Sequence, residues 1–212
     1  MILKGFREFI NESESNATYQ DLKLLLELGI AEDITDDVIR LLDQGKLNHA
    51  ELLDWTKSIC DKYKIKDWTL NSEGLVDVNG SVELDNIKLT RLPLRFGRVS
   101  GNFWCHNNQL TTLEGAPQWV GGDFDCTWNE LTILKWAPQK VGGDFMCSRN
   151  YLTTLDGAPK EVRGDFSCSS NRLTSLKGAP NLIGGSFYCN RNPLTSLEGI
   201  GEVKGKFYSD IK

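Results

Sequence analysis

The stretch "GGDFMCSRNYLTTLDGAP", residues 142 to 159, closely repeats the stretch ahead of it, "GGDFDCTWNELTILKWAP", residues 121 to 138. Each copy carries a cysteine with a Phe two residues before it, an Asn three residues after it, and leucines five and eight residues after it. The cysteines are 21 residues apart and are Cys105, Cys126, Cys147, Cys168 and Cys189. Five copies in phase predict a stack of similar coils.

The repeat continues in weaker form at both ends. An earlier copy begins at Gly80, with Val82 and Leu84 in the Phe and Cys places, and the last copy is one residue shorter and ends in Phe207 and Ser209. We therefore expect coils to start near residues 80, 101, 122, 143, 164 and 185, with a partial coil at 205.

The pattern F-x-C-x-x-N-x-L-x-x-L resembles the leucine-rich repeat segment L-x-x-L-x-L-x-x-N-x-L-x-x-L, with Phe and Cys at two leucine positions. The resemblance implies a right-handed solenoid in which F-x-C is a short strand of a parallel sheet lining a concave binding face. The expected fold class is an α+β solenoid: a leucine-rich repeat stack of 21-residue coils with a parallel β-sheet, capped by a small N-terminal helical domain.

The repeated residues have a consistent interior chemistry. Alternation along the strand places Phe and Cys inward, and a buried Asn can bond backbone groups of the turn that no ladder satisfies. The cysteines are interpreted as apolar filler. Parallel side-chain vectors disfavour disulfides, and a 21-residue spacing disfavours zinc, although redox and metal roles stay open as alternatives. We expect no metal and no cofactor.

The N-terminal third has helical rather than repeat spacing. Thr18 with Asp21, Thr35, and Asn48 with Glu51 are typical helix starts, and Gly45 is a typical stop. We expect an N-terminal segment over 1–15, a helical cap over 16–67 and the solenoid over 68–212. The expected helical core is Leu22, Leu25, Leu26, Val38, Leu41, Leu42, Leu52 and Ile59.

The first twelve residues, "MILKGFREFINE", resemble the capsid-targeting N-terminus of internal head proteins from T-even-type bacteriophages. The resemblance implies a processing site at Ile10 and Glu12. The alternatives are an amphipathic segment that docks on the cap, and a frayed tail. The repeats also resemble those of phage-encoded leucine-rich repeat proteins.

Charge and hydropathy limit the partners. Residues 1–67 hold 9 Lys and Arg against 14 Asp and Glu, and residues 68–212 hold 15 against 15. Neither part offers the one-sided basic surface that nucleic-acid binding usually needs. The apolar stretches are far shorter than the roughly 20 residues that span a bilayer. We expect a cytoplasmic protein that binds neither nucleic acid nor membranes.

Outward positions of the strand vary from coil to coil while the inward ones do not. They include aromatic, Met and Arg side chains, the types enriched at protein interfaces. The predicted partner-binding residues are Trp104, His106, Trp128, Met146, Arg149, Tyr188, Arg191 and Tyr208. The alternative is that these side chains only shield the sheet. Trp119 and Trp136 lie outside the expected strand and are interpreted as packing within the coil.

An acidic row, Asp123, Asp144 and Asp165, precedes the Phe column. It is interpreted as solvated, with cation binding or selection of a basic partner as alternatives. Only two histidines are present, and no nucleophile, phosphate loop or metal cluster is recognisable, so we expect no catalysis.

The sequence thus predicts a noncatalytic scaffold that binds a protein partner through the concave face, as a phage factor acting on a host or defence protein. The alternative is a packaged or structural protein of the virion interior. The oligomeric state stays open.

Overall fold

The structure is a computed structural model that describes residues 18–27 and 35–211. The chain divides into two compact units, Met1–Ser58 and Ile59–Lys212. The predicted N-terminal segment 1–15, with Ile10 and Glu12, lies outside the described residues.

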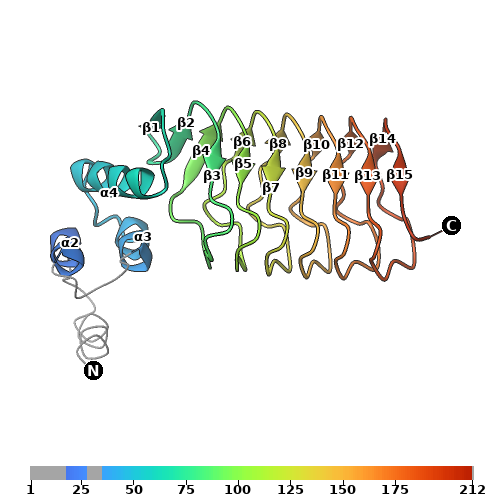
Figure 1. The fold of residues 1–212 in the computed structure, drawn as a ribbon, viewed down its shortest axis with the longest axis horizontal. Helices are drawn as coiled ribbons and strands as arrows, with labels where there is room; N and C mark the ends of the chain where they lie inside the picture. The colour runs from blue at the N-terminus through green and yellow to red at the C-terminus, as the bar shows by residue number, and fades with distance from the viewer. Residues whose placement is uncertain (1–17, 28–34, 212) are drawn as a thin grey trace, which may run out of the picture. The chain divides into compact units, whose positions relative to one another are not determined.

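The helices begin where local chemistry predicts. They are α2 (Tyr19–Glu27), α3 (Thr35–Asp43) and α4 (His49–Lys62) (Figure 1). Before α2, the Thr18 amide donates to Asp21 at 2.8 Å, and the Asp21 amide donates to the Thr18 hydroxyl at 3.3 Å. These hydrogen bonds lower the pKa of Asp21. Asn48 and Glu51 make the same reciprocal box before α4, so both predicted capping boxes are confirmed.

The predicted helical core is largely confirmed. Leu22, Val38, Leu41 and Ile59 are buried, whereas Leu42 and Leu52 are half-buried, and the side chains of Leu25 and Leu26 lie outside the described set. Gly45 ends α3 with a positive φ of 64°, and the Lys46 amide donates to the Leu41 carbonyl across this turn.

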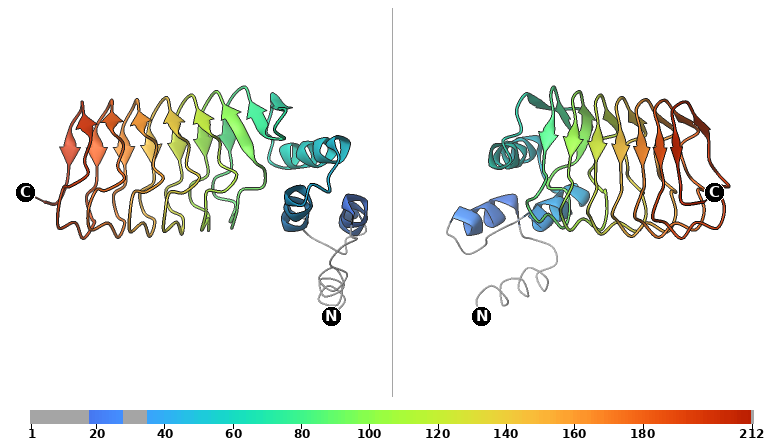
Figure 2. Two further views of the ribbon diagram at one scale, coloured as in Figure 1. Left: turned by 180° about the vertical axis from the view of Figure 1, so that it is seen from behind. Right: turned by 45° about the vertical axis from the view of Figure 1, so that its right-hand side comes forward.

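The second unit is a parallel β-solenoid in which successive coils stack in a nearly straight row (Figures 1 and 2). Its second sheet is the predicted one and has seven strands, all paired in parallel. These strands are β3 (Val82–Glu83), β5 (Phe103–Trp104), β7 (Phe124–Asp125), β9 (Phe145–Met146), β11 (Phe166–Ser167), β13 (Phe187–Tyr188) and β15 (Phe207–Tyr208). The register, Phe103↔Phe124↔Phe145, confirms the 21-residue coil.

Each coil also contributes a strand to a first sheet, which the repeat pattern does not predict. This sheet has eight strands, of which only β1 and β2 pair antiparallel. They are β1 (Trp68–Leu70), β2 (Val76–Val78), β4 (Phe96–Val99), β6 (Trp119–Val120), β8 (Lys140–Val141), β10 (Glu161–Val162), β12 (Leu182–Ile183) and β14 (Glu202–Val203). Trp119 does lie outside the expected F-x-C strand, but it belongs to β6 of this first sheet. Most of these strands are two residues long, too short for their alternation to be visible in the sequence.

The core lies between the two sheets and consists of stacked columns. The Phe column is fully buried from Phe103 to Phe187, and Phe103, Phe124, Phe145 and Phe166 stack with centroids 5.3 to 5.6 Å apart. Burying one such side chain stabilises the fold by about 1.5–3 kcal/mol. Since each coil exposes both of its flat faces unless another coil covers them, the stack folds as one structure.

The Asn column performs the predicted role. The Asn150 amide group donates to the Cys126 and Cys147 carbonyls at 3.0 and 3.1 Å, and its oxygen accepts from the Leu131 amide at 3.0 Å. Asn108, Asn129, Asn171 and Asn192 repeat this arrangement. Each Asn thus bonds the turn of its own coil to the coil before it.

The glycine that precedes the acidic residue is required by a close approach of coils. A Cβ on Gly143 would lie 2.1 Å from Oδ1 of Asp123, far inside van der Waals contact. The same holds for Gly164 against Asp144 and Gly185 against Asp165. Tight contact between coils, and not an unusual dihedral angle, therefore explains these glycines.

Candidate binding surface

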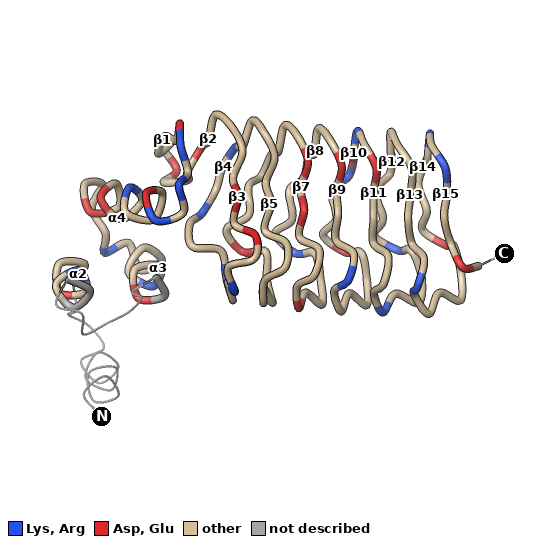
Figure 3. The backbone as a smooth tube through the Cα atoms, viewed as in Figure 1, with Lys and Arg blue, Asp and Glu red and all other residues tan. Residues whose placement is uncertain are grey.

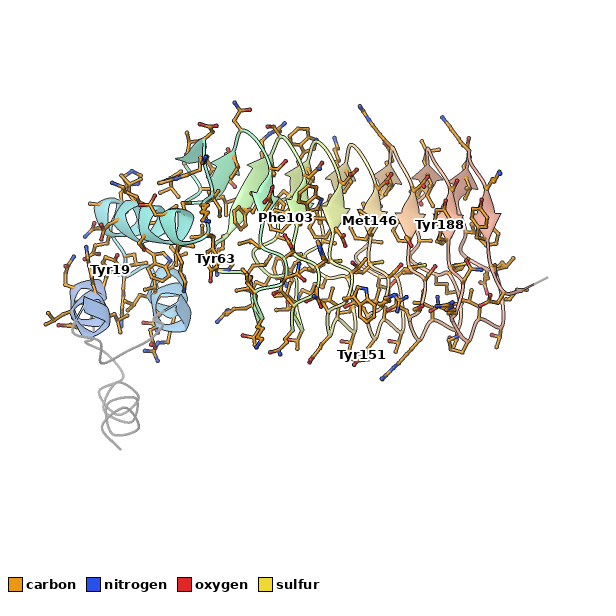
Figure 4. All side chains as sticks on the ribbon, in the orientation of Figure 1. Tyr19, Tyr63, Phe103, Met146, Tyr151 and Tyr188 are labelled. Atoms are coloured by element: carbon orange, nitrogen blue, oxygen red, sulfur yellow. The ribbon has the colours of Figure 1, made fainter. Side chains whose placement is uncertain are left out.

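The outward positions of the second sheet form one row across the coils. Strand register places Trp104, Asp125, Met146, Ser167, Tyr188 and Tyr208 next to one another in that order. All are half-buried except Tyr208, which is 37% exposed. Met146 and Tyr188 are labelled on this side in Figure 4. The predicted residues of this row therefore do share one face of one sheet.

Two tyrosines close the row at its C-terminal end. The rings of Tyr188 and Tyr208 stack with centroids 4.7 Å apart and planes within 5°. The stack confirms that the shortened last copy keeps its strand in register with the others. It presents an aromatic surface with hydroxyl groups, which can combine apolar contact with hydrogen bonding.

His106 lies between two carboxylates. Its Nε2 is 3.8 Å from Oδ2 of Asp85 and its Nδ1 is 3.4 Å from Oδ2 of Asp125. Nδ1 is buried and has no hydrogen-bond partner. In the part of the chain that the structure describes, no group of three or more His, Cys, Asp or Glu side chains is arranged to hold a metal ion.

Trp128 and Arg149 form the most exposed pair of the predicted set. Trp128 is 54% exposed, and the Arg149 guanidinium lies over its indole at 4.2 Å from the ring centroid. A cation in this position stabilises an exposed ring by about 0.5–1 kcal/mol. The pair is therefore partly ordered before any partner arrives.

Both residues have an unusual backbone conformation. The residue two after each cysteine has a left-handed φ, between 52° and 59°, in every described coil. The residues are Asn86, Asn107, Trp128, Arg149, Ser170 and Arg191, counting Asn86 in the degenerate first copy. Left-handed φ favours Gly and Asn and costs other residues about 1–2 kcal/mol. The conformation belongs to the coil, and its cost to Trp128 and Arg149 exceeds the roughly 0.5–1 kcal/mol that the contact between their side chains contributes.

The predicted residues contact one another in small groups. Trp128 contacts Arg149, Tyr188 contacts Tyr208, and Trp104 and Met146 flank Asp125 in the sheet. Among the described residues, no ring contact joins Trp104 to Trp128. The Arg191 amide donates to Asp210, and the Arg191 side chain is exposed.

A second pair of the same kind was missed by the sequence analysis. The Arg172 guanidinium lies 4.4 Å from the ring centroid of Tyr151, which is exposed. Figure 4 labels Tyr151 well away from Met146 and Tyr188, toward the other side of the coils. The signal was present in the sequence, because both residues directly follow a repeat Asn in adjacent coils.

The acidic row has a structural role in addition to its contact with solvent. Oδ1 of Asp123 accepts from the Asp144 amide at 2.8 Å, and Oδ1 of Asp144 accepts from the Asp165 amide at 2.7 Å. Asp165 continues the ladder to the Ser186 amide at 2.6 Å. One oxygen of each carboxylate is therefore committed to the next coil. Elsewhere on the solenoid, acidic and basic positions are interspersed (Figure 3).

The cysteine side chains are buried and unreactive. The six cysteines are unpaired and buried. Burial raises the pKa of Cys60 to about 12 and raises the pKa of Cys105, Cys126, Cys147, Cys168 and Cys189 as well. Since the thiolate is the nucleophile and the metal ligand, these groups are held in the unreactive form.

No helix in the described ranges is long and apolar enough to cross a membrane. Searches for a matching protein family, curated protein or solved structure found none.

Proposed function

We propose that this protein is a noncatalytic scaffold of the leucine-rich repeat type that binds a protein partner through the outward face of the second sheet and the turn that follows it. The observation that carries the proposal is the Trp128–Arg149 pair. The pair is exposed and preformed. Both of its residues have a left-handed φ, which Gly or Asn would adopt at a lower energetic cost. Residues kept against such strain are frequently functional.

The rest of the face supports the same function. Trp, Tyr and Arg dominate interface hot spots, and an interface core needs apolar area flanked by polar groups. Trp104, Met146 and the Tyr188–Tyr208 stack provide that area along one sheet. The surrounding columns hold the Asp85–His106–Asp125 group and the side chain of Arg191.

The phage resemblance extends the proposal to a host or defence protein as the partner, bound in the host cytoplasm. The alternative of a packaged virion protein is supported by the resemblance of residues 6–12, which lie outside the described ranges. The mass of the protein in purified particles tests it: a chain beginning at Ser13 supports packaging, and absence of the protein from particles refutes it.

The experiment for the scaffold uses two matched variants. Trp128→Ala with Arg149→Ala removes the proposed pair, and Tyr151→Ala with Arg172→Ala removes a similar pair outside the proposed face. Proteins captured from host lysate by the unaltered chain are identified, and the dissociation constant of each purified candidate is then measured. We expect the first variant to weaken binding at least about tenfold, or about 1.4 kcal/mol, and the second to leave it unchanged. Equal affinities of all three proteins would refute the proposed site.

A further inference from the structure

Two adjoining grooves lie over the outward side of the first sheet, away from the proposed protein-binding face. One, of about 460 Å³, is lined by Trp136, Arg95 and Glu114. The other, of about 610 Å³, is lined by Trp119, Arg98 and Lys140. Both include Leu75, Gln118 and Gln139, so they form one continuous surface with an indole in each part.

Trp136 occupies a glycine position of the repeat. The four neighbouring copies have Gly115, Gly157, Gly178 and Gly199 there, with φ between 86° and 96°. A Cβ would lie 2.6 Å from the Leu94 carbonyl oxygen at Gly115 and 2.5 Å from the Leu134 carbonyl oxygen at Gly157. The coil therefore disfavours any side chain at this place, by dihedral angle and by space.

Trp136 is nevertheless present, with a φ of 74° and 54% of its surface exposed. An indole that is half in solvent gains little from burial. The Lys135 Nζ lies over the ring at 5.0 Å from its centroid, and such a contact contributes about 0.5–1 kcal/mol, less than the roughly 1–2 kcal/mol that a left-handed φ costs. We interpret the strain as the consequence of a requirement for an aromatic face in the groove.

The polar groups of the groove include both donors and acceptors. The Gln118 side chain makes no hydrogen bond within the described residues, and Gln139 uses only its amide nitrogen, at 3.1 Å from the Ala137 carbonyl. Arg98 lies over the Trp119 ring at 4.4 Å, and Arg95 is 3.9 Å from Glu114. Three cations and three carboxylates line the two parts together: Arg95, Arg98, Lys140, Glu73, Asp77 and Glu114.

We propose that this groove binds a neutral oligosaccharide. A pyranose ring has an apolar face of C–H groups, which packs on an indole, and a rim of hydroxyls that both donate and accept. This matches aromatic faces set among amides and paired charges. A balanced charge disfavours strongly anionic or cationic ligands. A proline-rich peptide also docks on aromatic residues, but its prolines have no N–H to donate to the amide oxygens of Gln118 and Gln139.

The proposal does not depend on the protein-binding face, and its test keeps the two apart. The whole chain is applied to a printed array of neutral glycans, and hits are titrated by calorimetry beside decaproline and a hexauronate. We compare Trp136→Gly, Trp119→Ala and, as the control, Trp128→Ala. Trp136→Gly restores the residue that the coil favours, so its melting temperature is expected to equal or exceed that of the unaltered chain.

The expected result is that a neutral glycan binds, and that Trp136→Gly and Trp119→Ala each weaken it at least about tenfold while Trp128→Ala does not. Any of three results overturns the proposal: no neutral glycan binds, Trp136→Gly binds as well as the unaltered chain, or only decaproline or the hexauronate binds. Loss of protein binding in Trp128→Ala with retained glycan binding separates the two sites.

Discussion

Replacing Asn150 with Ala is expected to be among the most damaging single changes to a polar residue of the solenoid. Asn150 is only 4% exposed and makes three short hydrogen bonds. Without it, the buried Leu131 amide has no acceptor, which costs about 1–3 kcal/mol. The Cys126 and Cys147 carbonyls each lose one donor but keep another, from Asn129 and Asn171.

The two lost donations contribute about 1 kcal/mol each, so the free energy of unfolding is expected to fall by about 3–5 kcal/mol in total. Urea denaturation followed by tryptophan fluorescence and by far-ultraviolet circular dichroism measures this as a lower midpoint at an unchanged slope.

The matched control is Asn192→Ala. Asn192 makes the equivalent bonds, at 3.1, 3.0 and 3.0 Å, but in the last full coil, where it is half-buried. Water can replace part of what is lost there, so we expect a loss of about half the size. If Asn150→Ala costs less than about 1 kcal/mol, or no more than Asn192→Ala, the buried amide ladder does not hold the coils together as argued.

Three further predictions test the coil geometry. Ser170→Gly is expected to be about 1 kcal/mol more stable than Ser170→Ala, because only glycine adopts the φ of 57° without strain; equal urea midpoints would contradict this. Gly143→Ala is expected to lower the free energy of unfolding by about 1–3 kcal/mol through its contact with Asp123, whereas the exposed Thr153→Ala serves as the neutral control. Raising the pH above about 8.5 is expected to destabilise the fold by up to about 1.4 kcal/mol per pH unit for each buried thiol, because the raised pKa keeps the folded thiols protonated while the unfolded ones ionise. Urea titrations at a series of pH values from 7 to 10 should show this loss, and the free energy of unfolding should fall less steeply with pH in Cys126→Ala. A free energy of unfolding that does not change with pH in the unaltered chain would contradict the prediction.

Much of the fold could be predicted because each interior position recurs with the same residue type in successive copies of the repeat. Phe145, Cys147 and Asn150 recur in phase with their copies, and each type has one environment that suits it: apolar core for Phe and Cys, and an unsatisfied turn for Asn. The two helix capping boxes could also be predicted, because each is formed by two residues only three apart in the sequence. The binding surface was harder, since side chains that vary carry no periodic signal. The outward positions could be predicted, but the contacts of Trp128 with Arg149 and of Tyr188 with Tyr208 come from the structure.

The sequence by itself determined the period of the stack, the residues of its interior and the shortened last copy, because a repeated burial pattern can be satisfied only by stacking. The tertiary structure alone decided the second set of strands, the use of the acidic row, and the left-handed φ of Trp128 and Trp136. Those features depend on where the backbone of the adjacent coil lies. A two-residue strand is formed by its neighbours, an aspartate finds its amide one coil away, and a strained dihedral angle is imposed by the path of the coil.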